Sequence, residues 1–202
     1  VGARPSLLTQ GVRQFRARDF ASAQALLGRA VQESPKDTLA KLYSARCSFA
    51  MGNYDQAIEL LTEQGQFGSH ELEAFYWTGK SYQELAVQTL ERMVGIDPNS
   101  YRVHQMTGAL LEDKRKYAEA IDAYQKALKP SPDLMGIRFA IGNTYWKMQN
   151  LDEALVWLKD ELARNPYHAS ANYRVGTIYL SKGSTDQAVP FLEKAVQANP
   201  AI

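Results

Sequence analysis

The feature that constrains this chain most is a constant spacing between like residues that recurs along it. Glycines stand at positions 108, 142 and 176, alanines at 120, 154 and 188, and prolines at 98, 132, 166 and 200, so the residue number rises by 34 each time. The same step separates Ala23 from Ala57 and Leu27 from Leu61 near the start of the chain. A period of this length predicts a quasi-linear array of repeated units, each packed on its neighbours.

Each repeat unit reads as two helices joined by a short turn. In residues 101–134, apolar residues recur at helical spacing, stop at the DKRK segment of residues 113–116, and then resume. Pro130 and Pro132 are expected to end the second helix. One such hairpin cannot bury its apolar face alone, so the sequence predicts an all-α stack of helix hairpins.

These columns resemble the tetratricopeptide repeat (TPR) family over essentially the whole chain. The family pattern is found as Ile141, Gly142, Tyr145, Ala154, Leu158 and Pro166, and again as Val175, Gly176, Tyr179, Ala188, Leu192, Ala195 and Pro200. The resemblance implies a right-handed α-solenoid of six units, at about residues 4–37, 38–70, 71–100, 101–134, 135–168 and 169–202. Because the motif residues are core positions, the match speaks for fold more than for function.

The third unit is shorter than the others by five. Ala45 to Gly79 is one full period, whereas Ala57 to Ala86 falls five short of it, so the loss lies between Tyr82 and Ala86, where the hairpin turn belongs. The segment SYQELAVQTLERM that covers this point contains no Gly, Pro, Asn or Asp.

We therefore expect the two helices of the third unit to be fused into one, from about Glu71 to about Ile96. At 1.5 Å per residue this helix would be roughly 39 Å long. An excised loop, with the residues renumbered across it, is the competing explanation. Just upstream, the second helix of the second unit is expected to end at Gly65, and the segment GQFGSH is interpreted as a flexible joint.

Three parts follow from this arithmetic: N-terminal TPR hairpins at 1–70, a junction helix at 71–98, and a C-terminal TPR array of three units at 99–202. No further helix is expected to cover the apolar side of the last one, which carries Val189 and Val196. Self-association through this last helix, or more chain beyond it, is therefore expected.

Composition argues against several classes of function. The chain has 23 Lys and Arg against 22 Asp and Glu, so no net field attracts nucleic acid. No apolar run reaches the length of a membrane span. The single cysteine, Cys47, allows no intramolecular disulfide and fits a reducing compartment, which favours a soluble, cytoplasmic protein. Because the sequence does not begin with Met, a removed signal peptide stays open.

Candidates for catalysis or metal binding are isolated. Cys47 lies in a helical apolar pattern and is interpreted as a small core residue. The three histidines His70, His104 and His168 have no partner at metal-ligand spacing. No nucleophile stands with a base, so we expect neither catalytic activity, nor a cofactor, nor a metal.

The resemblance implies a peptide-binding groove lined by the non-core face of the first helix of each unit. Carried over by repeat position, that face comprises Tyr43, Arg46, Tyr76, Trp77, Lys80, Arg102, Gln105, Met106, Phe139, Asn143, Trp146, Lys147, Tyr173 and Arg174. Aromatic, Met, Arg and Asn side chains are typical anchors of interfaces. The alternative is that half of these aromatic residues simply pack between repeats.

Some relatives of the family hold a carboxylate with a set of Lys, Asn and Arg residues across three units. Asn143 and Arg174 match that set, but Gln105, Ala109 and Ser170 stand where it requires Lys or Asn. The complete clamp is absent, and a protein or peptide ligand with acidic and apolar groups is expected instead. A non-catalytic interaction scaffold is thus the leading hypothesis. The alternatives are a structural segment of a larger protein and the substrate-recruiting arm of an enzyme.

Overall fold

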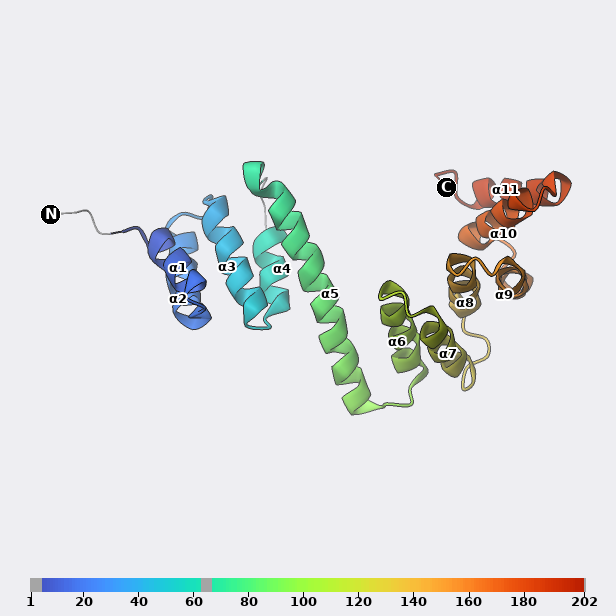
Figure 1. Cartoon of the computed structure of the whole chain (residues 1–202), viewed down its shortest axis with the longest axis horizontal. Helices are drawn as coiled ribbons and strands as arrows, with labels where there is room; N and C mark the ends of the chain where they lie inside the picture. The colour runs from blue at the N-terminus through green and yellow to red at the C-terminus, as the bar shows by residue number, and fades with distance from the viewer. Residues whose placement is uncertain (1–4, 63–66, 202) are drawn as a thin grey trace. The chain divides into compact units, whose positions relative to one another are not determined.

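The computed structural model describes residues 5–62 and 67–201, and throughout them the secondary structure is helical. The α-helices are α1 Leu7–Arg16, α2 Phe20–Glu33, α3 Thr38–Ala50, α4 Tyr54–Thr62, α5 Glu71–Ile96, α6 Tyr101–Asp113, α7 Tyr117–Leu128, α8 Ile137–Lys147, α9 Leu151–Arg164, α10 Ala169–Ser181 and α11 Thr185–Ala198 (Figure 1). The predicted all-α class is confirmed.

The chain divides into two compact units, Val1–Thr89 and Leu90–Ile202. In the first unit, α1 pairs with α2 and α3 pairs with α4, and α2 packs on α3. In the second unit the pairs are α6 with α7, α8 with α9 and α10 with α11, while α7 packs on α8 and α9 on α10. Each unit is thus a stack of helix hairpins. The division at residues 70 and 98 stays a prediction.

Every hairpin turn in the described residues uses the same backbone device. One residue with positive φ closes the first helix of the pair: Arg18, Gly52, Arg115, Gln149 or Gly183. At one such turn the Gln149 amide donates to the Trp146 carbonyl at 2.9 Å, and the Asn150 amide donates to the Tyr145 carbonyl at 3.0 Å. Such a left-handed residue satisfies the last carbonyls of a helix and reverses the chain.

The shortened third unit contains no such turn, and α5 is one helix of 26 residues. No residue between Glu71 and Ile96 has positive φ. The hydroxyls of Thr78, Ser81 and Thr89 donate to carbonyls four residues earlier at 2.7 to 2.8 Å, as side chains on a continuous helix do. The fused helix predicted from Glu71 to Ile96 is confirmed with these bounds.

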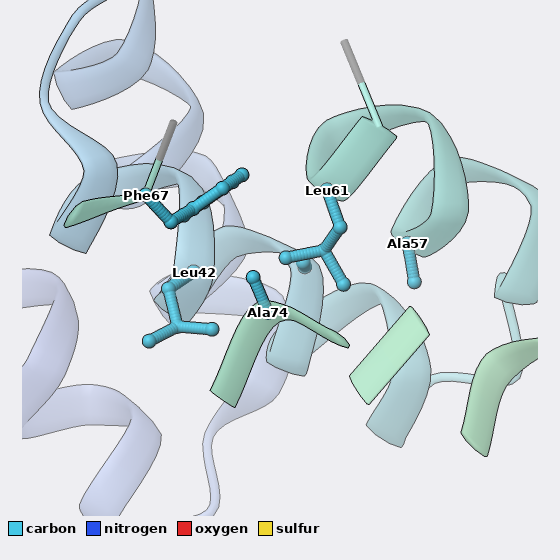
Figure 2. Close-up of a cluster of buried hydrophobic side chains, with 6 residues drawn as sticks. Leu42, Ala57, Leu61, Phe67 and Ala74 are labelled. Carbon is cyan, nitrogen blue, oxygen red and sulfur yellow. The ribbon is translucent and has the colours of Figure 1, made fainter. Parts of the chain in front are cut away.

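In the first unit the start of α5 is held against α3 and α4 by a buried apolar cluster (Figure 2). Leu42, Ala57, Leu61 and Ala74 meet Phe67 there. Phe67 is buried, and residues Gly68–His70 form a 3-10 turn that leads directly into α5. The interpretation of GQFGSH as a flexible joint missed this aromatic anchor, because the glycines on both sides dominate the local composition. The expected helix end at Gly65 lies outside the described residues.

In four of the five complete hairpins of the described residues, a glycine of the first helix lies directly against a side chain of the second helix. A Cβ atom built on Gly142 would lie 2.8 Å from Cγ of Leu158, and one built on Gly108 would lie 2.6 Å from Cδ1 of Tyr124. These distances are shorter than any normal contact between carbon atoms, so only glycine allows this packing. The column of glycines is therefore explained by helix packing inside the hairpin.

Candidate interaction surface

Side chains from the first helices of successive hairpins contact each other when their sequence separation is three residues less than the repeat period. In the second unit Glu112, Asn143 and Arg174 form such a series, and each hydrogen bond between them joins residues 31 positions apart in the sequence. In the first unit the same offset joins Phe15, Arg46 and Trp77. The difference from the period is about one turn of helix, since neighbouring first helices are displaced along their axes. The two series occupy equivalent positions, but they carry different chemistry.

In the first unit, Arg46 on α3 lies among three aromatic rings, and we call Phe15, Tyr43, Arg46 and Trp77 the Arg46 cluster. The guanidinium carbon is 5.0 Å from the ring centres of Phe15 and Tyr43 and 5.3 Å from that of Trp77. Phe15 and Tyr43 also meet edge to face, with ring centres 5.5 Å apart. Arginine stacked on aromatic faces in this way is stabilised by the ring quadrupoles.

Arg46 nevertheless has unused hydrogen-bonding capacity. Its Nε atom is buried and has no acceptor among the described residues. In that part of the chain its guanidinium also forms no salt bridge with a carboxylate. The cluster is therefore a cation on an aromatic surface without a neutralising partner.

Helix α5 carries two further predicted residues, Tyr76 and Lys80, and Tyr76 lies next to this cluster. Tyr76 is exposed and meets Trp77 edge to face, with ring centres 5.4 Å apart. Trp77 in turn packs on Phe49 at 5.2 Å, so part of its surface belongs to the core. Lys80 follows one turn later on α5 and is half-buried. The continuous α5 thus contributes the aromatic residues at the edge of the Arg46 cluster.

In the second unit, Glu112 at the end of α6 is the centre of a polar network. Its side chain is only 12% exposed and accepts hydrogen bonds from the Tyr124 hydroxyl at 2.9 Å and from the Asn143 amide at 3.4 Å. Lys147 forms a salt bridge with the same carboxylate at 2.7 Å. We call Glu112, Tyr124, Asn143, Lys147 and Arg174 the Glu112 network. It neutralises Lys147 within the chain.

Arg174 on α10 extends this network but keeps its charge available. Its Nε donates to Oδ1 of Asn143 at 3.1 Å, and its guanidinium carbon lies 3.8 Å from the ring centre of Trp146. Among the described residues it forms no salt bridge with a carboxylate. Arg174 in the second unit and Arg46 in the first therefore share one arrangement, an unpaired guanidinium on an aromatic face.

The remaining predicted residues do not join these two groups. Arg102 is exposed, donates to Gln105 at 3.3 Å, and lies over the ring of Tyr101. Met106 is half-buried on the same helix. Phe139 packs against His168 and the core between α8 and α10, so it belongs to inter-repeat packing. Tyr173 is exposed on α10.

Three residues of these groups are not predicted from the sequence. Its pattern favours Phe15 as a substitute core residue, Glu112 as a solvated acid beside a turn, and Tyr124 as a core residue. Phe15 and Glu112 can be recognised by their sequence separation from Arg46 and Asn143, respectively. This separation is found by subtracting about one helical turn from the repeat period.

Burial raises the pKa values of two groups near these surfaces, Tyr124 and Cys47. Burial, together with the charge of Glu112 and the hydrogen bond to it, raises the pKa of Tyr124. Burial also raises the pKa of Cys47 to about 11, and neighbouring Arg46 offsets only part of this effect. A thiol with this pKa is protonated at neutral pH, and Cys47 is a fully buried core residue, as predicted.

The described residues contain no group of three or more His, Cys, Asp or Glu side chains placed to hold a metal ion. No helix within residues 5–62 and 67–201 is both long enough and apolar enough to cross a membrane. The Arg46 cluster and the Glu112 network present guanidinium, aromatic and amide groups.

Comparison with known families agrees with this architecture. A tetratricopeptide repeat model matches residues 14–67, a TPR repeat model matches 108–149, and a further tetratricopeptide repeat model matches 139–201. The BBSome complex member bbs-4 of Caenorhabditis elegans is 23% identical over 159 residues, which are 72% of this chain and 34% of the relative. The tetratricopeptide repeat-containing protein trd-1 of the same organism is 21% identical over 177 residues, 88% of this chain and 18% of the relative.

The chain thus spans about a third or less of the length of these two curated relatives. Among solved structures, the APC/C hetero-tetramer Cut9-Hcn1 aligns with a TM-score of 0.52 at 18% identity, over 97% of this chain and 40% of that one, and so shares its fold. The helix hairpins, their constant period and the three matched segments agree with one another. This chain is a member of the tetratricopeptide repeat family.

Proposed function

We propose that this chain is a non-catalytic protein-interaction scaffold that binds a partner segment on its first-helix face. The observation that carries the proposal is the pair of arginines, Arg46 and Arg174, each lying on aromatic rings without a carboxylate partner among the described residues. Arginine and aromatic residues together dominate the binding energy of protein interfaces. Each unit offers one such anchor.

The chemistry of the anchors defines the partner. A guanidinium binds a carboxylate through two parallel hydrogen bonds, and this pairing is stronger than one between neutral groups. The rings around Arg46 and the Trp146 indole beneath Arg174 offer apolar area beside the charge. The partner segment therefore carries Asp or Glu side chains next to apolar ones.

The Glu112 network determines which basic side chains of the second unit are available to bind an acidic partner. Repeat position alone assigns Arg102, Lys147 and Arg174 to an acidic partner, but Lys147 is already paired with Glu112 at 2.7 Å. A second carboxylate at Lys147 would have to compete with Glu112, which is nearly buried and hydrogen-bonded to Tyr124. We therefore assign the acidic contact in the second unit to Arg174, with the Asn143 amide beside it.

A second candidate function is a repeat segment within a larger assembly protein. Its support is that the chain spans 34% and 18% of the length of two curated relatives, one of which is named as a BBSome complex member. The same first-helix face would then hold a subunit of that assembly. A catalytic domain elsewhere in a longer protein, recruiting its substrate through this segment, is the third reading.

Selection from a displayed library of random peptides tests the binding proposal without knowledge of the partner. We expect enriched peptides to combine acidic and apolar residues. Replacing Asn143 and Arg174 with Ala should weaken the binding of peptides that use the second unit by more than about tenfold, because both the charge and its hydrogen-bonded support are lost. Arg46→Ala should do the same for peptides that use the first unit.

Arg29→Ala is the matched control, since Arg29 is exposed on the second helix of its hairpin and pairs with Glu33. This variant should bind the selected peptides as the unaltered chain does. The proposal fails if the library yields no acidic peptides, or if their affinity, measured by titration calorimetry, is the same in all the variants. Thermal unfolding of each variant shows whether a loss of binding reflects a loss of folding.

A further inference from the structure

Helix α5 has an apolar face that is exposed along its first half and half-buried over most of its second half. Leu72, Phe75 and Tyr82 are 83%, 68% and 55% exposed. Ala74, Ser81 and Trp77 lie on the opposite side of the helix and pack within the first unit. This side follows three-or-four spacing and carries no charged residue. It consists of the exposed residues Leu72, Phe75, Tyr76, Gly79, Tyr82, Gln83 and Val94 and the half-buried residues Ala86, Val87, Leu90 and Met93. We call this set the α5 stripe.

In the complete hairpins of the second unit the equivalent residues lie in the core. Tyr82 corresponds by repeat position to Leu111, Tyr145 and Tyr179, which pack against core clusters. Ala86 corresponds to Ala120, Ala154 and Ala188, which are fully buried. The α5 stripe therefore consists of the two faces that pack on each other in a complete hairpin, and here they lie one after the other along a single helix.

The contact between a glycine of the first helix and a side chain of the second shows how closely these two halves match. In four of the five complete hairpins of the described residues, a glycine of the first helix receives a side chain of the second helix at one constant offset. The pairs are Gly11 with Leu27, Gly108 with Tyr124, Gly142 with Leu158, and Gly176 with Leu192. With five positions lost, the same pair in the third unit is Gly79 and Leu90. On a straight helix they lie roughly 16 Å apart and cannot touch. No atom lies within 4 Å of a Cβ position at Gly79.

We propose that the α5 stripe binds the α5 stripe of a second copy of this chain in antiparallel orientation. The half at residues 71–82 of each copy then packs on the half at 86–96 of the other, and Leu90 of one copy fills the space at Gly79 of its partner. Both halves of the hairpin are present in each chain, and only the turn between them is missing. Shortening such a turn is a known physical route to exchange of elements between protomers.

Side chains on and beside the stripe fit the same register. In the reversed alignment that joins Gly79 to Leu90, Phe75 of one copy meets Val94 of the other. Lys80 and Glu91 border the stripe, and across the two copies they are offset by roughly 3 Å along the axis, which a lysine side chain spans. Neither forms a salt bridge within residues 5–62 and 67–201. A two-fold axis makes each of these contacts twice.

Light scattering on the whole chain over a concentration series is the first test. The unaltered chain should form a dimer, and Gly79→Leu should raise its dissociation constant at least about tenfold, because the added side chain occupies the space of Leu90. Leucine favours helix over glycine, so α5 itself stays formed. The matched control is Gly95→Leu on the same helix, off the stripe and with nothing within 4 Å of its Cβ position, which should leave the dimer intact.

Cysteine cross-linking then tests the orientation. In a Cys47→Ala background, a mixture of the Phe75→Cys and Val94→Cys chains should form a disulfide-linked dimer faster than either chain alone. Within one chain these positions lie roughly 28 Å apart on the helix and cannot be joined. A monomer at every concentration overturns the proposal. So does a dimer that Gly79→Leu leaves unchanged, as self-association through α11 would, or a mixture that cross-links no faster than its components.

Discussion

Replacing Leu158 with Ala should lower the free energy of unfolding of the second unit by about 2–5 kcal/mol. Leu158 on α9 is fully buried in the cluster that joins α8, α9 and α10. Truncation removes its transfer free energy and leaves a cavity between helices that approach at Gly142. Urea denaturation followed by circular dichroism measures the change.

Val156→Ala is the matched control, because Val156 lies on the same helix and is 63% exposed. Its effect should stay within about 0.5 kcal/mol. If the two variants unfold at the same urea concentration, Leu158 does not have the central packing position described above.

A double-mutant cycle tests the glycine contact itself. Gly142→Ala alone should cost about 1–3 kcal/mol, because its Cβ would lie 2.8 Å from Cγ of Leu158. Combined with Leu158→Ala, the new methyl group fills part of the cavity, so the double variant should be more stable than the sum of the two single effects predicts, by about 0.5–3 kcal/mol. Strict additivity would contradict the close approach.

The thiol of Cys47 should react with iodoacetamide at pH 8 at least about a hundredfold more slowly in the folded chain than in urea. Burial raises its pKa from 9.0 to about 11, which lowers the thiolate fraction at this pH by about that factor. Its position in the core with Ala23 and Leu27 hinders access as well. Mass spectrometry of quenched samples gives the two rates.

The raised pKa of Cys47 also makes the free energy of unfolding fall as the pH rises. The folded state holds this proton more tightly than the unfolded state does, so the contribution of Cys47 is fully present below pH 9 and is lost as the pH rises from 9 toward 11. Cys47→Ala removes this part of the alkaline loss. Equal alkylation rates in folded and unfolded chains would show that the thiol is accessible and unshifted.

The repeat architecture could be predicted from the sequence because its signals are local and repeated. The columns of Gly, Ala and Pro indicate the hairpins, and the phase count alone places the fusion between Tyr82 and Ala86. The physical reason is that a turn needs a residue with positive φ, as at Gly52 or Gln149, and the shortened unit lacks this position.

The partners of the surface residues could not be predicted in the same way. Repeat position placed Arg46 and Arg174 on the first-helix face, but whether a charge is free depends on the neighbouring repeat. Lys147 is neutralised by Glu112, a residue that looks like a solvated acid in its own helix. Phe67 likewise looks like part of a loop, although it anchors α5. Contacts between repeats decide these cases, and a single repeat does not reveal them.

The measurement that tests the continuous α5 most directly is the distance between spin labels near its two ends. In a Cys47→Ala background, labels at Glu73→Cys and Glu91→Cys occupy exposed positions. Double electron–electron resonance on a sample diluted with unlabelled chain reports only the distance within one chain. A continuous helix predicts backbone positions about 27 Å apart. A hairpin in the third unit would instead bring the two positions to about 10 Å, and that result would contradict the fused helix.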